Sequence, residues 1–319
     1  MIVFLTGATG FIGSHVAVEM AKNLKCTIIA PVRKAGGYKN TDFLLTLGVI
    51  LKEGSISKRE FLESIFMEYH IDYIIHLAAI RGAGKGTLDD YQLTNVLTTE
   101  VLLDYAYRYG VKRFIFCSSV GVWGTIPKQV PPNETTPLDN DNYYHQSKIE
   151  AEKRVNNYIK KGLDGVIVRP TITYGTGDDG FPDKLIKLVK KKKLILPRND
   201  VKIHLISVKK LAELFVILLK IKKINQRVFV AVDKDPISLK QLVDLIYEYY
   251  FGKLYPRYLY VPEFLFNLAI FISMIIRNET WSTRFKLISQ NWFYLTKNSE
   301  VYIQPVDTKF GFKNYLQSL

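Results

Sequence analysis

The chain has 319 residues, of which 48% are hydrophobic and 23% charged, so it holds enough apolar material for a large folded core. Its formal net charge is +14, yet no nucleic-acid-binding motif accompanies the basic residues, and we expect a small-molecule substrate and no nucleic-acid partner. The two cysteines, Cys26 and Cys117, form neither a C-x-x-C pair nor a metal-ligand pattern, which predicts no metal site and a reducing compartment. Met1 leads straight into a strand-like run without the features of a secretion signal, so we expect a cytoplasmic protein.

The first motif is a glycine-rich turn at the N-terminus. The apolar run 2–5 predicts a buried strand, and residues 11–22 predict a helix. Between them, Gly7 permits a tight turn, Gly10 lets the backbone approach a pyrophosphate, and Gly13 lets the helix pack closely on the strand. The pyrophosphate would then bind the unpaired N–H groups at the start of the helix. The predicted dinucleotide site at this turn comprises Gly7, Thr9, Gly10, Phe11, Ile12 and Gly13.

Strand-like and helical segments then alternate, which is typical of βαβ units. The strand-like runs are residues 26–32, 49–52, 73–76, 113–117 and 165–169, and the helical segments are 58–69, 87–109 and 143–161. We therefore expect an α/β fold with a doubly wound parallel sheet (a Rossmann core) over residues 1–170. Residues 171–319 are expected to form a smaller, mainly substrate-binding lobe, of which about 204–232 packs back on the core.

The most apolar stretch of the chain is 261–276. Pro262, Glu263 and Asn267 interrupt it, and its uninterrupted part is shorter than the ~20 residues that cross a bilayer. We expect no transmembrane span, and favour a helix packed in the C-terminal lobe over a helix lying on a membrane surface.

The second motif is a tyrosine–lysine pair near the start of the helix predicted over 143–161. Tyr144 and Lys148 are four residues apart, so their side chains share one face of the helix. A phenol needs its pKa lowered by ~2–3 units to work as an acid or base near neutral pH. An ammonium ~4 Å away contributes about 4 kcal/mol at an effective dielectric constant of ~20, which is sufficient. Ser118 and Ser119 follow a predicted strand, where a hydroxyl can polarise a substrate oxygen.

These motifs, in this order, resemble the extended short-chain dehydrogenase/reductase family, which includes NAD-dependent epimerases and dehydratases. The resemblance covers most of the chain and rests on residues 6–13, 76–79, Asn95, Ser119, Tyr144, Lys148 and 169–175. It implies that Tyr144 is the catalytic acid and base, that Lys148 lowers its pKa and holds the cofactor ribose, and that Ser119 binds the substrate oxygen. It also implies a homodimer through the helices at 87–109 and 143–161.

The resemblance implies a nicotinamide dinucleotide as cofactor, and one departure bears on which one. Relatives that prefer NAD carry an acid after the second strand, whereas this chain has Arg33 and Lys34, and Arg33 is placed to pair with a 2′-phosphate. The sequence therefore favours NADP and leaves NAD open. Together with the glycine turn, Tyr144 and Lys148, the implied cofactor residues are Arg33, Ser55, Ile56, Leu77, Ala78, Ala79, Asn95, Pro170 and Ile172.

Three functions remain open. The leading hypothesis is an oxidoreductase that interconverts a secondary alcohol and a ketone by hydride transfer. The alternative is a nucleotide-sugar epimerase or dehydratase with retained NAD, although the arginine expected on the sugar nucleotide's diphosphate is replaced near Ile203, where Lys202 is the nearest cation. A cofactor-binding regulator without activity is the third, and the presence of Ser119, Tyr144 and Lys148 argues against it.

Overall fold

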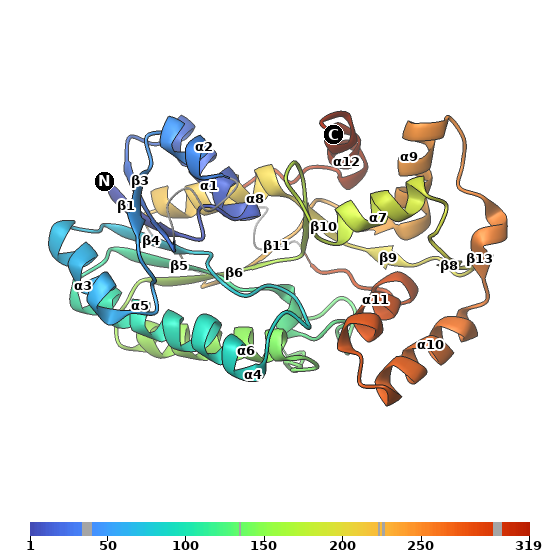
Figure 1. Cartoon of the computed structure of the whole chain (residues 1–319), viewed down its shortest axis with the longest axis horizontal. Coiled ribbons are helices and arrows are strands. Elements are labelled where there is room, and N and C mark those ends of the chain that lie inside the picture. Colours follow the sequence, from blue (N-terminus) through green and yellow to red (C-terminus); the bar gives the residue numbers. More distant parts are fainter. Residues whose placement is uncertain (34–39, 134, 223, 225–226, 296–301) are drawn as a thin grey trace.

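Seven parallel strands form one sheet in the computed structural model, which describes residues 1–33, 40–133, 135–222, 224, 227–295 and 302–319 (Figure 1). Their order is β11-β6-β5-β4-β1-β2-β3, so the winding reverses between β1 and β4. At such a reversal the carboxyl ends of the strands border a crevice for ligands. The strands are β1 (Ile2–Thr6), β2 (Thr27–Val32), β3 (Ile50–Glu53), β4 (Tyr73–His76), β5 (Arg113–Cys117), β6 (Gly165–Pro170) and β11 (Val228–Ala231). The predicted doubly wound parallel sheet is confirmed.

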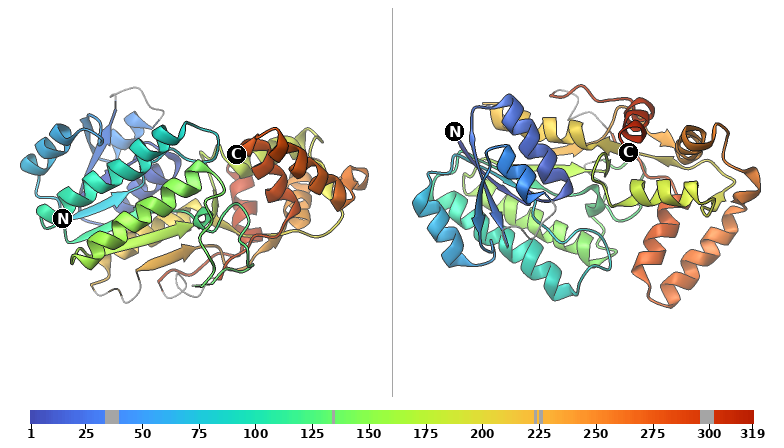
Figure 2. Two further views of the ribbon diagram at one scale, coloured as in Figure 1. Left: turned by 90° about the horizontal axis from the view of Figure 1, so that it is seen from below. Right: turned by 45° about the horizontal axis from the view of Figure 1, so that its top comes forward.

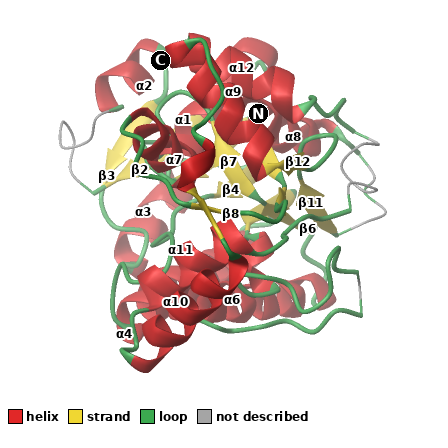
Figure 3. Cartoon of the chain, turned by 90° about the vertical axis from the view of Figure 1, so that its right-hand side faces the viewer, coloured by secondary structure: helices red, strands yellow, loops and turns green. Residues whose placement is uncertain are grey.

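Helices cover both faces of this sheet, as the end-on view in Figure 3 shows. One layer contains α1 (Phe11–Asn23), α2 (Thr41–Thr46) and α8 (Val208–Lys220), and the other contains α3 (Arg59–Glu68), α5 (Thr98–Arg108) and α6 (Tyr143–Lys160). Strand β1 shows how the sequence builds both layers, because successive side chains point to opposite faces. Val3 and Leu5 pack in the core under α1 and α8, and Phe4 packs in the core under α3, α5 and α6.

The segment predicted as one helix over 87–109 contains a π-helical turn. Its parts are α4 (Leu88–Tyr91), the π-helical η1 (Gln92–Leu97) and α5. From the start of α5, the Thr98 hydroxyl donates to the Leu93 carbonyl of the turn at 2.9 Å, and the Thr99 hydroxyl donates to the Asn95 carbonyl at 2.7 Å. π-turns inside α-helices occur frequently at functional sites, and this one presents Asn95 to the end of β4.

The C-terminal part adds helices and three short strand pairs around a second core that contains Tyr174, Trp292 and Phe312. The pairs are β7 (Ile172–Tyr174) with β10 (Leu205–Ser207), β8 (Leu196–Pro197) with β13 (Tyr260–Val261), and β9 (Lys202–Ile203) with β12 (Ile237–Ser238). The remaining elements are η2 (Val120–Val122), α7 (Phe181–Lys190), α9 (Leu239–Phe251), η3 (Arg257–Leu259), α10 (Glu263–Ile275), α11 (Glu279–Ser289) and α12 (Thr308–Gln317). Between β10 and β12 the chain returns to the first core, where α8 packs on α1 and β11 extends the sheet beside β6.

The apolar stretch near 261–276 forms α10, which packs against α11. Both helices project from the C-terminal part of the molecule (Figures 1 and 2). Only Phe266, Ile270 and Ser273 of α10 are buried, so this helix is packed on one side alone. The sequence predicts a helix packed in the C-terminal lobe, and the structure shows such packing for one side of α10 only. Within the described ranges, no helix is long and apolar enough to cross a bilayer.

Candidate active site

The glycine turn between β1 and α1 has the shape that a pyrophosphate requires. Gly7 has φ +72°, and a Cβ there would lie 2.8 Å from the Ala78 nitrogen; a Cβ on Gly13 would overlap the Gly7 carbonyl. Gly10 is the N-cap of α1 and supplies no side-chain hydrogen bond, so the first-turn N–H groups are available to an anion. Side chains at Gly7 and Gly13 would therefore disrupt this turn, as expected for a turn that binds a dinucleotide. The same turn carries Thr9, Phe11 and Ile12.

A buried histidine ties the carboxyl ends of β1 and β4 together. His76 Nδ1 lies 2.7 Å from the Thr6 hydroxyl, and Nε2 lies 2.9 Å from the Thr99 hydroxyl of α5. Thr6 Oγ1 also accepts the backbone N–H groups of Leu77 and Ala78 at 3.2 Å. Burial, with a smaller effect from Lys148, lowers the pKa of His76 to about 3, so the ring is neutral. Leu77, Ala78 and Ala79 are predicted cofactor residues. The support from Thr6 and Thr99 was not predicted, because these two residues are far apart in the sequence.

Asn95 connects the segment after β4 to α6. Its Oδ1 accepts the Ile80 N–H at 2.8 Å, and its Nδ2 donates to the Ile80 carbonyl at 3.0 Å and to the Ser147 hydroxyl at 2.9 Å. Both amide hydrogens of the buried side chain are therefore used within the protein. In this structure Asn95 positions the backbone next to the predicted cofactor residues.

Tyr144 lies in the first turn of α6, next to Ser119. The helix begins at Asn142, whose side chain accepts the His145 N–H at 2.9 Å. Burial raises the pKa of the Tyr144 phenol, while the Ser119 side chain and the charge of Arg81 act to lower it. The structure thus brings together Tyr144 and the serine that the sequence selected as the group for the substrate oxygen.

Lys148 lies one turn further along α6, with its side chain buried. Its Nζ donates to the Cys117 carbonyl at 2.8 Å and lies 4.8 Å from the centre of the Phe116 ring. Burial lowers the pKa of Lys148, while Cys117 and Glu152 act to raise it. The ammonium is therefore held at the carboxyl end of β5, on the helix face that also carries Tyr144.

Glu152 is a functional candidate that sequence reasoning missed. It follows Lys148 by one more turn, and its buried carboxylate accepts a hydrogen bond from Ser118. Arg169 donates to both carboxylate oxygens, at 2.9 and 2.6 Å, and its guanidinium lies 4.7 Å from the centre of the Trp123 ring. The signal was present as the spacing 144, 148, 152, which places all three side chains on one face of the helix. Of the two predicted serines, Ser118 therefore supports Glu152, and Ser119 lies by Tyr144.

Arg33 occupies the end of the second strand, as the sequence predicts. Its side chain is exposed, and the backbone N–H of Gly54 donates to the Val32 carbonyl at 2.8 Å, which brings the end of β3 beside it. Lys34, the second cation of this segment, lies outside the described residues, which omit 34–39.

The remaining predicted cofactor residues also follow strands of the main sheet. Ser55 and Ile56 are half-buried after β3, and the Ser55 hydroxyl lies 2.8 Å from that of Ser57. Pro170 is buried at the end of β6 and Ile172 begins β7. Since the strands of the main sheet are parallel, the candidate residues gather at the carboxyl ends of these strands. Among the described residues no cluster of three or more His, Cys, Asp or Glu side chains could hold a metal ion.

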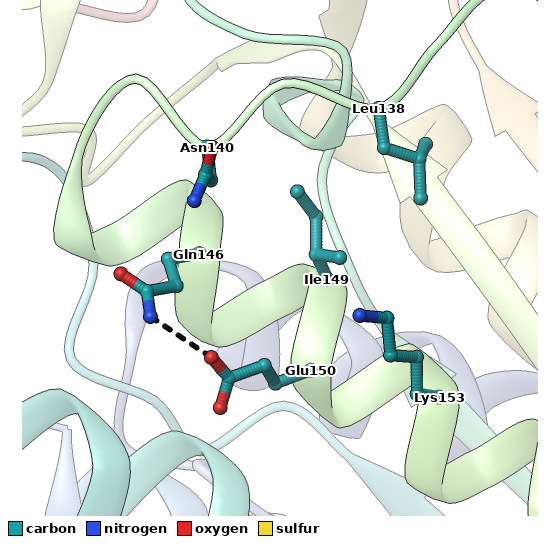
Figure 4. Close-up of a pocket in the computed structure, with 6 residues that line it drawn as sticks. All are labelled: Leu138, Asn140, Gln146, Ile149, Glu150 and Lys153. Atoms are coloured by element: carbon teal, nitrogen blue, oxygen red, sulfur yellow. Dashed lines mark hydrogen bonds between the residues drawn. The ribbon is translucent and has the colours of Figure 1, made fainter.

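A separate small pocket lies on the other side of α6 (Figure 4). Gln146 donates to Glu150 at 3.0 Å in this pocket. At 3.6 residues per turn, the positions that line it point away from the face that carries Tyr144, Lys148 and Glu152, so the pocket belongs to another surface. Its lining residues are Leu138, Asn140, Gln146, Ile149, Glu150 and Lys153.

Comparisons with known proteins agree with this geometry. The model of the NAD dependent epimerase/dehydratase family matches residues 3–231. The dTDP-D-glucose 4,6-dehydratase of Dictyostelium discoideum is 32% identical over 204 residues, which cover 58% of this chain and 46% of that protein. A UDP-glucose 4-epimerase of Bacillus subtilis is 28% identical over 158 residues, covering 48% of this chain and 46% of that protein. The chain thus matches about half the length of these curated relatives.

Two solved structures resemble the chain over nearly its whole length. The UDP-glucose 4-epimerase of Thermotoga maritima with UDP-glucose has a TM-score of 0.77 and 22% identity, covering 99% of this chain and 98% of that one. The UDP-glucuronic acid 4-epimerase of Bacillus cereus in complex with NAD has a TM-score of 0.76 and 21% identity, covering 100% and 99%. At these identities the likeness establishes the fold.

Proposed function

The chain belongs to the NAD-dependent epimerase/dehydratase family, and from that premise we propose that it epimerises a hydroxyl-bearing carbon of a nucleotide-linked sugar. The expected family and the expectation of an enzyme are thereby confirmed. Of the hypotheses from the sequence, we therefore prefer the nucleotide-sugar epimerase or dehydratase with retained NAD. It replaces the leading hypothesis of an oxidoreductase acting on a secondary alcohol or ketone. The relatives supply the substrate class, since those matched act on UDP-glucose and dTDP-glucose derivatives by name.

The observation that carries the proposal is that Tyr144 lies by Ser119 on the helix face that also carries the buried Lys148. A nicotinamide dinucleotide held at the turn of Gly7, Gly10 and Gly13 would supply the acceptor for the hydride of the alcohol carbon and the donor for its return. Burial raises the pKa of Tyr144, contrary to the lowering that the sequence leads one to expect, so its phenolate form depends on nearby positive charge such as that of Arg81. In that form Tyr144 takes the hydroxyl proton while Ser119 hydrogen-bonds the same oxygen. Tyr144 gives the proton back when the ketone is reduced on its opposite face, so no net oxidation occurs.

Epimerisation fits the residues near Tyr144 better than dehydration does. Loss of water needs a base for a carbon-bound proton and an acid for the departing hydroxyl, in addition to the groups that handle the alcohol. Ser119 is followed by Val120 and Gly121, which supply neither. The buried carboxylate nearby, Glu152, is already paired with Arg169. The remaining acid–base group there is His145, whose ring lies 5.6 Å from that of Tyr144 and whose Nδ1 is hydrogen-bonded to Asp141. Epimerisation needs Tyr144 alone and is therefore the simpler reaction for these residues.

We propose NAD, retained through the cycle, as the cofactor. The family description and the NAD named with a solved neighbour support this choice, while the cation Arg33 supports the NADP that the sequence favours. The two can be separated by identifying the dinucleotide released on denaturation and by titrating the emptied protein with each. Tenfold or tighter binding of NADPH, lost in Arg33→Ala, would replace NAD by NADP.

We also propose a homodimer in the cytoplasm. Apolar side chains are exposed along the outer side of η1, α5 and the start of α6, where the family resemblance implies the dimer contact. These side chains are Leu93, Leu97, Tyr107, Tyr109 and Tyr143. Light scattering after size-exclusion chromatography tests the dimer, and Leu93→Glu with Leu97→Glu should yield monomers.

The central test is turnover of UDP-hexoses and dTDP-hexoses, followed by NMR of the sugar ring. Tyr144→Phe should lower kcat by at least 10²-fold, because the proton carrier is lost, without altering dinucleotide content. Tyr143→Phe is the matched control, since the neighbouring phenol is 42% exposed and the substitution keeps its apolar ring at the proposed dimer contact. This variant should keep wild-type activity. Equal activity in both variants contradicts the role of Tyr144. Steady consumption of added NADH or NADPH with a ketone restores the oxidoreductase hypothesis, and dinucleotide binding without turnover across the panel favours a regulator.

A further inference from the structure

Helix α10 presents an apolar stripe to the outside of the molecule. The residues at 264, 268, 271 and 275, together with 265 and 272, recur at the spacing of one helical face. The buried residues Phe266, Ile270 and Ser273 lie on the opposite face, against the protein. We call the exposed set the hairpin surface; its side chains are 41–64% exposed and comprise Phe264, Leu265, Leu268, Phe271, Ile272, Met274, Ile275 and Ile276.

Such a surface is unusual for a helix on a water-exposed protein. Surface helices normally turn their polar side to water and bury the apolar one. Between 264 and 276 the chain has no charged residue, and Glu263 stands at the N-terminus of α10. Contiguous exposed apolar area of this kind marks an interaction site. In Figure 1, α10 projects from the C-terminal part at the lower right, with α11 beside it.

Aromatic and basic residues stand at the border of the hairpin surface, and Glu263 and Glu279 stand at the starts of the two helices. Arg277 follows α10 directly and is exposed. On α11, Trp281 is 48% exposed, and the Arg284 guanidinium lies 5.1 Å from the centre of its ring. Tryptophan and arginine are suited to the boundary between acyl chains and headgroups, because each combines an apolar body with a polar end.

The charge of the surrounding lobe has the same sign. Residues 171–319 contain 24 Lys and Arg against 13 Asp and Glu, so this part carries most of the net charge of +14. Basic residues next to a membrane surface are attracted to anionic lipid headgroups. A second copy of the chain would instead bring Arg277 and Arg284 against equally basic neighbours, which disfavours self-association through this surface.

We propose that α10 and α11 dock the protein on an anionic lipid bilayer, with α10 parallel to the membrane plane and the hairpin surface immersed. The helix has 13 residues and is thus about 20 Å long at ~1.5 Å per residue, so it lies in the interface. Arg277 and Arg284 then reach the lipid phosphates. This inference is independent of the proposed reaction, because it involves neither the predicted cofactor residues nor Tyr144.

The test uses the intrinsic fluorescence of the full-length chain. Trp123 and Trp292 are 6% and 1% exposed, so the exposed Trp281 alone can reach lipid. Vesicles of phosphatidylcholine with 30% phosphatidylglycerol, carrying brominated acyl chains, should quench the emission, and Trp281→Phe should remove that quenching. Binding to these vesicles should exceed binding to pure phosphatidylcholine at least tenfold at low salt and weaken as salt is added.

Matched variants separate apolar insertion from charge. Phe271→Ser with Ile275→Ser should lower vesicle binding at least tenfold, and Arg277→Glu with Arg284→Glu should remove the preference for anionic lipid. Met67→Ser on α3, where the side chain is 76% exposed, should leave binding unchanged. Absence of wild-type binding to either vesicle overturns the proposal. So does a self-associating species that Phe271→Ser with Ile275→Ser dissociates in the absence of lipid, because that result assigns the surface to a second copy.

Discussion

At the scale of single residues, Glu152 is a buried carboxylate of the candidate site whose charge depends on its partners. Its carboxylate is buried and accepts hydrogen bonds from Ser118 and from two nitrogens of Arg169. Removing one partner of a buried ion pair leaves the other charge uncompensated and typically costs about 3–5 kcal/mol. Glu152 also helps to keep Lys148 protonated, since it acts to raise the pKa of that ammonium.

Glu152→Gln is therefore expected to lower the free energy of unfolding by about 3 kcal/mol, measured by urea denaturation. Glu150→Gln is the control on the same helix: Glu150 is half-buried and accepts hydrogen bonds from Gln92 and Gln146. We expect it to change stability by about 1 kcal/mol or less. Equal effects of the two substitutions would show that the Arg169 pair contributes no special stability.

At the scale of elements, the sequence predicts the strands well because each is a short apolar run with a β-branched or aromatic composition. The runs at 73–76 and 113–117 coincide with β4 and β5. The run at 26–32 starts one residue before β2, and the run at 49–52 is shifted by one residue from β3. The π-turn η1 was not predicted, because its residues continue the helical pattern of 87–109 and carry no local signal of a wider turn. The apolar composition of α10 predicts a helix but not which side is covered, because periodicity does not identify the packing partner.

The candidate site divides in the same way. Gly7, Gly13, Tyr144 and Lys148 could be selected from the sequence, because a tight turn and an i, i+4 pair leave local patterns. The hydrogen bonds that hold them join residues such as Thr6 and His76, which are 70 positions apart. Contacts of that separation leave no trace in a single sequence.

The π-turn gives a prediction at this scale. Asn95→Ala removes three hydrogen bonds to Ile80 and Ser147, and leaves buried polar groups without their partner. We expect the segment after β4 to loosen and dinucleotide binding to weaken at least fivefold in a fluorescence titration. Thr94→Ala, one position away and half-buried, should bind the dinucleotide as wild type does. Unchanged affinity in Asn95→Ala would show that the segment is held by its backbone alone.

At the scale of the whole molecule, one buried carboxyl joins the two parts of the chain. Asp233 follows β11 of the main sheet, and its side chain accepts hydrogen bonds from the Tyr174 hydroxyl at 2.8 Å and the Ser207 N–H at 3.0 Å. Its backbone carbonyl lies 2.9 Å from Nε2 of the buried His204. Burial raises the pKa of Asp233 to about 7, against the opposing effect of these hydrogen bonds.

This pKa makes the junction sensitive to pH. Below about pH 4 the carboxyl is protonated in both the folded and the unfolded chain, because its ordinary pKa is near 3.9. Between pH 4 and 7 the unfolded chain loses the proton while the folded one retains it, so the unfolded state binds fewer protons and stability falls as pH rises. Asp233→Asn cannot titrate. The wild-type free energy of unfolding should therefore fall relative to that of Asp233→Asn by about 2 kcal/mol between pH 5 and 7, measured by urea denaturation at each pH. Parallel pH profiles for the two proteins would mean that Asp233 is ionised in the folded chain and that Tyr174 and Ser207 stabilise its charge.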